Sequence, residues 1–203
     1  MSAKSPTSSD PVVGDGELSG RAIAVVGSDA SASAIRELLA AKGARLPSWP
    51  LDDPRAGLDG LVFIAPTLAV RSIAETSAAA LGEDLGAGLG EAFASLQAAV
   101  AAMRVKAGGG AVVFVAPPAP GQRAYDAFQS GLRLMVKAAA LELGPEHIRV
   151  NVVLPGGGSG AAAPLGRRCA PNDVAQAVAF AASDRAKFMT GADLVVDGGR
   201  MLT

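Results

Sequence analysis

Apolar residues gather in short runs that recur along the chain. Runs of this length without polar alternation are typical of strands that are buried on both faces of a sheet. The pattern predicts strands at residues 22–26, 44–49, 61–65, 111–116, 148–153 and 193–197. The second of these is a weak candidate because Pro47 interrupts it.

The segments between these runs have helical spacing of their apolar residues. Helices are predicted at residues 31–44, 70–81, 89–106, 123–143 and 171–183. Alternating strands and helices favour an α/β fold with a doubly wound parallel sheet. We expect one shortened domain over residues 19–203. Residues 1–18 are rich in Ser, Pro, Asp and Gly, and we expect them to form a disordered tail.

The two longest predicted helices each carry one apolar stripe that we expect to face the sheet. The stripes consist of Leu89, Phe93, Leu96, Val100 and Met103 in one helix and Tyr125, Phe128, Leu132, Met135 and Ala139 in the other. The opposite faces carry small residues, namely Ala94, Ala98, Ala101, Ala102, Ala127, Gly131 and Ala138. Small residues there would let another helix pair approach closely. The alternative is that they are exposed alanines that reflect the composition of the chain.

Composition narrows the class of protein. The chain has 203 residues, half of them apolar, and 18 basic and 19 acidic residues give a net charge of -1. This balance argues against nucleic acid or an anionic membrane as the main partner. We find no apolar run as long as a membrane span and no signal peptide, and we expect a cytoplasmic protein. The single cysteine, Cys169, and single histidine, His147, fit no metal-ligand spacing.

Several separated stretches carry a family resemblance. The strongest are AAALELGPEHIRVNVVLPGG at 138–157 and VAQAVAFAASDRAKFMTGADLVVDGG at 174–199; LDGLVFIAP at 58–66 and GRAIAVVG at 20–27 match more weakly. In this order they resemble the short-chain dehydrogenase/reductase family, especially its ketoacyl-reductase branch. The resemblance implies a Rossmann-like fold, an NAD(P) cofactor and hydride transfer. We interpret the chain as a degenerate member of that family.

The turn that would bind the cofactor pyrophosphate departs from the family pattern. It reads VGSDASASA at 26–34, where Gly27 matches the first glycine of the family motif. Ser31 and Ser33 occupy the places of the other two glycines, and their side chains stand where close approach is needed. Asp29 adds a negative charge beside the expected phosphates. We therefore predict that Ser31 caps the following helix and that the turn binds no phosphate.

Further cofactor elements are missing from the sequence. The chain passes from residues 44–49 almost directly to residues 61–65, which leaves no room for the helix and strand that would enclose the adenine. Asp52 or Asp53 is a possible partner for a ribose hydroxyl, but each stands in a proline-flanked loop, and we expect them only to solvate that loop. The expected Asn-Asn-Ala-Gly turn is replaced by the apolar residues 63–66.

The catalytic positions implied by the resemblance are also altered. Tyr125 matches the family tyrosine, but Gln129 stands where a lysine would lower the phenol pKa from its usual value near 10. Pro117 and Gly88 replace the serine and the asparagine. We interpret Tyr125 as vestigial. Two basic residues are possible substitutes for the lysine: Lys137 lies too far along the helix, and Arg123 is expected to face solvent. The usual helical lid is replaced by GSGAAA at 158–163.

The altered or missing residues belong to the expected cofactor and catalytic sites, whereas the strands of the sheet and the long helices are kept. We hypothesise a non-catalytic subunit that binds no cofactor itself and pairs with a complete reductase of the same family. Pairing would use helices 89–106 and 123–143 and strand 193–197, with NAD(P) on the partner. The resemblance implies a beta-hydroxyacyl or beta-ketoacyl substrate on CoA or a carrier protein. The alternatives are an active oxidoreductase with a rewired site and a ligand-binding or regulatory module that uses the old cleft.

Overall fold

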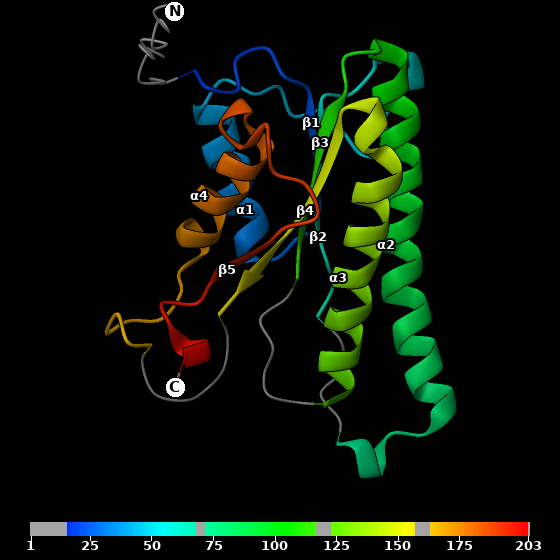
Figure 1. Cartoon of the computed structure of the whole chain (residues 1–203), viewed down its shortest axis with the longest axis vertical. Helices are drawn as coiled ribbons and strands as arrows, with labels where there is room; N and C mark the ends of the chain where they lie inside the picture. The colour runs from blue at the N-terminus through cyan, green and yellow to red at the C-terminus, as the bar shows by residue number, and fades with distance from the viewer. Residues whose placement is uncertain (1–15, 68–71, 117–122, 157–162, 203) are drawn as a thin grey trace, which may run out of the picture.

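Strands in the described residues form one parallel sheet in the order in which they occur along the chain (Figure 1). The structure is a computed structural model that describes residues 16–67, 72–116, 123–156 and 163–202, with the backbone alone for residues 54, 73 and 123–126. The strands are β1 (Ile23–Val26), β2 (Gly60–Ile64), β3 (Gly110–Val115), β4 (Ile148–Pro155) and β5 (Asp193–Val196). The predicted parallel sheet is confirmed.

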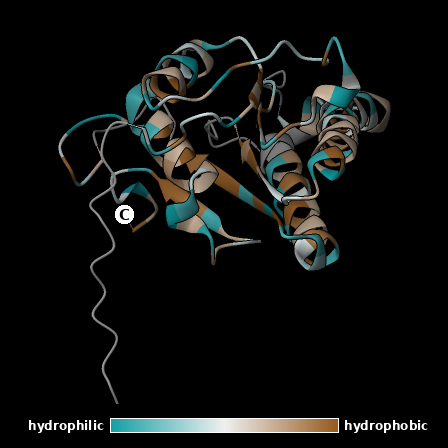
Figure 2. Ribbon diagram, turned by 90° about the horizontal axis from the view of Figure 1, so that it is seen from above, coloured by the Kyte–Doolittle hydropathy of each residue, from teal (hydrophilic) through white to brown (hydrophobic). Residues whose placement is uncertain are grey.

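Helices cover both faces of the sheet. They are α1 (Ala30–Ala41), α2 (Ala78–Lys106), α3 (Arg123–Leu143) and α4 (Pro171–Ala182). In Figure 1, α1 and α4 lie on one side of the sheet and α2 and α3 on the other. Each side has its own apolar core, and Figure 2 shows hydrophobic strands between the two helix layers. Alternate residues of β1 to β4 supply both cores, which explains why these strands read as continuous apolar runs. Strand β5 was expected to be buried on both faces and is not, because Leu194 and Val196 are partly buried against one core and Val195 is 46% exposed.

The prediction of a strand at residues 44–49 is wrong. Residue Arg45 forms one isolated bridge with Ala22, and its amide and carbonyl bond to Arg21 O at 2.8 Å and Ile23 N at 2.9 Å. Pro47 lacks the N–H group that a longer ladder would need. Between α1 and β2 the remaining regular element is the short 3-10 helix Pro54–Ala56. Strand β1 therefore lies at an edge of the sheet.

A side chain covers part of this edge. The guanidinium of Arg36 on α1 donates to the carbonyl oxygens of Val25 at 2.9 Å and Gly27 at 2.8 Å. These carbonyls have no neighbouring strand on that side. Exposed edge groups are a template for unwanted strand pairing, and proteins commonly cover them. Arg36 fills part of the place that a further strand would take.

Helix α2 is longer than expected. The predicted helices at 70–81 and 89–106 are replaced by the 3-10 helix Ile73–Glu75 and one continuous helix that begins after the N-cap Ser77, while residues 68–71 lie outside the described part. Of the four glycines between residues 82 and 90, Gly88 is buried against α3, and Leu85 and Leu89 beside it pack against the core. By length and composition, α2 is the one described helix that could cross a membrane, which the sequence pattern did not predict. Its inner face packs in the core beside β2 and α3.

Two further expectations need correction. Phe93 is 50% exposed and Ala102 is buried, because the buried line of α2 runs through Ala92, Leu96, Ala99 and Met103. The tail was predicted to extend to residue 18. Leu18 is instead fully buried and donates from its backbone to Lys42 O at 3.0 Å. The folded part therefore includes residues 16–18.

Candidate functional site

The loops after the strands meet at the C-terminal edge of the sheet. In open α/β sheets this edge is where ligands bind. Gly27 follows β1, Ala65 follows β2, Gly156 follows β4 and Asp197 follows β5. Pro117, which follows β3 and replaces the family serine, lies outside the described residues. The candidate site is therefore built from the turn after β1, the facing ends of α2 and α3, and the ends of β4 and β5.

The turn after β1 is packed against the neighbouring strand. Gly27 has a φ of +117°, and a Cβ added there would lie 2.8 Å from Ile64 Cβ. Glycine at this position is thus explained by contact with β2 and by its backbone conformation. Its presence gives no support to a phosphate site.

The first turn of α1 is capped by Asp29, which corrects the prediction of Ser31. The carboxylate of Asp29 accepts a hydrogen bond from Ala32 N at 2.8 Å. Ser31 is half-buried and Ser33 is exposed, both within the helix. A carboxylate stabilises the positive end of the helix dipole, and it repels a second anion at the same place. The helix terminus that would face a pyrophosphate already carries a negative charge.

Gly88, which was predicted to replace the family asparagine, lies in the contact between α2 and α3. Gly88 is buried on α2, and a Cβ there would lie 2.6 Å from Cε2 and 3.1 Å from Cζ of Phe128 on α3. The Phe128 ring is fully buried in the core and has no room to turn away. An asparagine side chain does not fit at position 88.

Gln129 lies on α3 where the family lysine is expected. It lines a pocket of about 300 Å³ together with Arg133, Arg200, Asp197, Met201 and the residues at the ends of β4 and β5. An uncharged amide gives no cation with which to lower a phenol pKa. The side chain of Tyr125 lies outside the described part, so its predicted vestigial role stays a prediction. The same holds for the prediction that Arg123 faces solvent.

Lys137 is directed to β5. Its Nζ donates to Gly191 O at 3.0 Å and Asp193 Oδ1 at 3.1 Å, while Arg133 donates to Asp193 Oδ2 at 2.6 and 3.0 Å. Burial acts to raise the pKa of Asp193, but the hydrogen bonds from Arg133 and Lys137 outweigh it and hold that pKa below its ordinary value. These two cations join α3 to β5. That Lys137 does not replace the family lysine stays a prediction.

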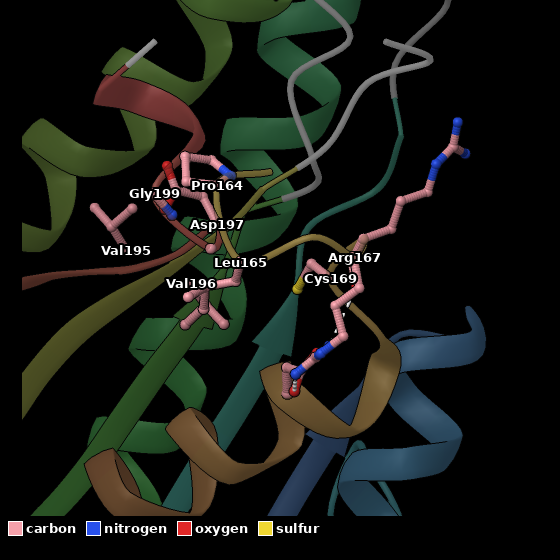
Figure 3. A pocket seen from close by; sticks show the side chains of 11 residues that line it. Pro164, Leu165, Arg167, Cys169, Val195, Val196, Asp197 and Gly199 are labelled. Atoms are coloured by element: carbon pink, nitrogen blue, oxygen red, sulfur yellow. Dashed lines mark hydrogen bonds and ion pairs between the residues drawn. The ribbon is translucent and has the colours of Figure 1, made fainter. Parts of the chain in front are cut away.

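A second pocket, of about 430 Å³, lies on the α4 side of β5 (Figure 3). Arg167 forms a two-bond ion pair with Asp173 at 2.5 and 2.8 Å at its edge. The sulfur of Cys169 points toward the ends of β4 and β5. Burial, followed by the charge of Asp173, raises the pKa of the Cys169 thiol, so this cysteine is protonated and weakly nucleophilic at neutral pH. The expected linker at 158–163 lies outside the described residues except for Ala163.

The remaining candidate residues have local structural contacts. Asp52 accepts from Ser48 at 2.8 Å, and Asp53 caps the short 3-10 helix by accepting from Arg55 N at 2.9 Å, as predicted for a loop. His147 is exposed and has a φ of +59° at the end of a 3-10 turn. No group of three possible metal ligands occurs within the described ranges.

Sequence reasoning missed three residues of this region. Arg36 was not singled out, and the cap was assigned to Ser31 although aspartate at position 29 is an equally good cap. Arg133 was not singled out. Its i, i+4 spacing with Lys137 on one side of α3 was a usable signal, since two cations on one face call for an acidic partner.

Comparison with known proteins places these features in a family. The family described as Enoyl-(Acyl carrier protein) reductase matches residues 53–158 and 157–201. Cyclopentanol dehydrogenase from Comamonas testosteroni is 35% identical over 164 residues, which cover 70% of this chain and 65% of that protein. Trans-4-hydroxycyclohexanecarboxylate dehydrogenase from Sinomonas cyclohexanicum is 37% identical over 123 residues, which cover 53% of this chain and 46% of that protein. The chain thus spans about half to two thirds of the length of these relatives.

Solved structures agree on the fold. A short-chain type dehydrogenase/reductase from Mycobacterium marinum superposes with a TM-score of 0.79 at 22% identity, covering 92% of this chain and 97% of that one. A short-chain dehydrogenase/reductase from Burkholderia xenovorans, described as putative, gives a TM-score of 0.80 at 23% identity, covering 93% and 99%. The family match over most of the chain and the shared fold lead to one conclusion: the chain belongs to the short-chain dehydrogenase/reductase family.

Proposed function

We propose that this chain is a non-catalytic member of its family that assembles with a complete reductase. The observation that carries the proposal is the contact between Gly88 and Phe128, which fills the position of the expected asparagine with core packing. A site under selection for proton transfer needs a polar group there. Here the space is used to bring α2 and α3 together.

The proposal extends to the cofactor. A dinucleotide needs a helix terminus open to its phosphates, and Asp29 already caps α1. Gly27 is packed against Ile64, and between residues 44 and 58 the described chain forms only the three-residue 3-10 helix Pro54–Ala56, which is too short to enclose an adenine. These residues do not fit NAD(P). We place the cofactor on the partner subunit.

The outer face of α2 and α3 is the proposed contact surface. Phe93, Leu134 and Leu141 are 50%, 66% and 83% exposed. Between the helices lies a pocket of about 320 Å³ whose lining includes Phe93, Val100 and Met135. Apolar side chains beside small residues are suited to close helix packing. Strand β5 offers a second surface because no further strand of the described residues pairs with it and Val195 is 46% exposed.

The substrate of the assembly follows from family likeness alone. A ketoacyl-reductase-like partner would act on a beta-hydroxyacyl or beta-ketoacyl group carried on CoA or a carrier protein. The chain would stabilise that partner or complete its substrate pocket across the interface. We place the assembly in the cytoplasm.

Two other functions each have one supporting observation. The relatives compared above are named dehydrogenases, which favours an active oxidoreductase with a rewired site. The pockets of about 430 and 300 Å³ on either side of β5 favour a ligand-binding module. Both would use the same edge of the sheet.

Calorimetric titrations with NAD⁺, NADH, NADP⁺ and NADPH distinguish the non-catalytic subunit from the rewired oxidoreductase. The proposal expects no binding up to millimolar concentration. A dissociation constant in the micromolar range for any of the four would favour the rewired oxidoreductase and overturn the proposal.

A further inference from the structure

A large cavity lies at the N-terminal ends of the strands, whereas the candidate site lies at their C-terminal ends. Its volume is about 650 Å³, within the range of small-molecule sites. Residues at or just before the N-terminal ends of the strands line it, among them Arg21, Asp59, Gly108, Gly109, Gly110, His147, Arg149, Asp184, Lys187, Phe188 and Thr190. No function considered above uses this edge.

The carboxylates of this cavity are already neutralised. Asp59 accepts from Lys106 Nζ at 2.6 Å and from Ala22 N at 2.7 Å. Asp184 forms an ion pair with Arg21. Neither acid is left to balance a further cation on the cavity wall.

Two cations remain without a carboxylate in contact. Arg149 donates to the carbonyl oxygens of Ala181 at 2.9 Å and Ser183 at 3.1 Å. Burial, and to a lesser degree the charge of Arg21, lowers the pKa of Arg149, while the charge of Asp184 acts in the opposite direction. The Lys187 side chain is exposed and enters no ion pair within the described ranges. An anion in the cavity would relieve this excess of positive charge.

The cavity also offers surfaces for a flat group. The Phe188 side chain is fully exposed at its rim. Three consecutive glycines, Gly108 to Gly110, leave part of the wall free of side chains, and a side chain at Gly109 would clash with His147 O. A bare backbone wall and an aromatic ring are the kind of surfaces against which a planar ring packs.

We propose that this cavity binds an anion that carries a flat aromatic ring, of the size of a nucleoside monophosphate. The anionic group would lie against Lys187 and Arg149. The ring would stack on Phe188 and pack against the glycine wall. This site is independent of the proposed function because it lies at the other edge of the sheet.

The test is a titration of the ¹⁵N-labelled protein with AMP, followed by NMR. We expect shifts at Gly108–110 and Thr190 and saturation at submillimolar to millimolar AMP. Adenosine and ribose 5-phosphate, which each lack one half of the ligand, should bind at least about tenfold more weakly. Saturating shifts in the turn at residues 27–33 instead, or equal affinity for ribose 5-phosphate, would overturn the proposal.

Variants at exposed positions test the same site without disturbing the core. Phe188→Ala should weaken AMP binding about tenfold through lost stacking. Lys187→Ala should weaken it about fivefold and reduce its salt dependence. Phe93→Ala, which removes a half-exposed ring on α2, is the matched control and should leave AMP binding unchanged. Unchanged affinity in the Phe188 and Lys187 variants would contradict the assignment.

Discussion

The ring of Phe128 on α3 lies directly over Gly88 on α2, so close that a Cβ at position 88 would meet Phe128 Cε2 at 2.6 Å. The two helices approach each other at the one glycine of α2 that is buried. This contact holds the middle of α2 against α3 and leaves no space for a side chain at position 88.

Two alanine substitutions on α2 should have opposite effects on stability. Gly88→Ala inserts a methyl group against a buried ring and should destabilise the fold by about 1–3 kcal/mol. Gly90→Ala, two residues away, meets no atom within 4 Å and should stabilise it by about 0.5–1 kcal/mol through helix propensity. Urea unfolding of the two variants measures the difference. Equal effects would mean that the Gly88–Phe128 contact is not close.

Arg36 should stabilise the edge of the sheet. Arg36→Met keeps much of the aliphatic side chain but leaves the carbonyls of Val25 and Gly27 without their donor. We expect a loss of about 1–2 kcal/mol and faster hydrogen exchange in β1. Glu37→Ala, at the neighbouring exposed position, is the control and should change stability by less than about 0.5 kcal/mol. Unaltered exchange in β1 would refute the role of Arg36.

Asp173 should contribute stability that depends on pH. Hydrogen bonds from Arg167 and from Ala170 N lower its pKa from 3.8 to about 2. Because the folded pKa is the lower one, this stabilisation is complete above about pH 4 and is lost as the pH falls toward 2. A ¹³C NMR titration of the carboxyl should give the low value in the native protein and a value near 3.8 in Arg167→Ala. The Asp173→Asn variant should lack this part of the acid dependence, and a normal pKa in the native protein would rule out the ion pair in solution.

Restoring one catalytic residue should not restore cofactor binding. Gln129→Lys supplies the missing cation, but Asp29 still caps α1 and Gly27 still packs against Ile64. Calorimetry with NADPH should therefore detect no binding to this variant. The double variant Gln129→Lys/Asp29→Ser also removes the negative charge at the helix terminus, and it tests the same expectation more strictly. Micromolar affinity in the single variant would show that the site is one substitution from function.

The outer face of α2 and α3 should determine assembly. Leu134→Lys places a charge on an exposed apolar position of α3 and should weaken partner binding about thirtyfold or more, with little change in the melting temperature. Leu165→Lys, on an exposed loop beside α4, is the control. Size-exclusion chromatography with light scattering on the co-purified complex reads out both variants. If the complex dissociates only in the Leu165→Lys control, the interface lies on another face of the molecule.

The parallel sheet was predictable because short apolar runs between helical segments are typical of buried strands. Each of β1 to β5 overlaps a predicted apolar run, and α1, α3 and α4 begin within a residue of their predicted starts. The failures have physical causes. The strand at 44–49 had apolar content but no neighbour beyond it, and α2 crossed its glycines because tertiary contact at Gly88 outweighed propensity.

The positions at which the candidate site differs from the family pattern were predictable, but the contacts that its residues make instead were less so. Family likeness identified Ser31, Ser33, Gly88 and Gln129 as altered positions. Side-chain partners such as Arg36 with Val25 or Arg133 with Asp193 depend on contacts between distant segments. Sequence spacing does not encode those contacts. The cavity at the N-terminal ends of the strands was even less predictable from the sequence, because its lining comes from the loops before all five strands.

Native mass spectrometry of the protein isolated from its own cells at low salt tests the central claim most directly. The account predicts a mixed assembly in which this chain, free of nucleotide, is bound to a complete reductase that retains the tyrosine and lysine of the family. A homo-oligomer that carries bound NAD(P) would contradict it, because Asp29, Gly88 and Gln129 would then be compatible with the chemistry that they are proposed to exclude.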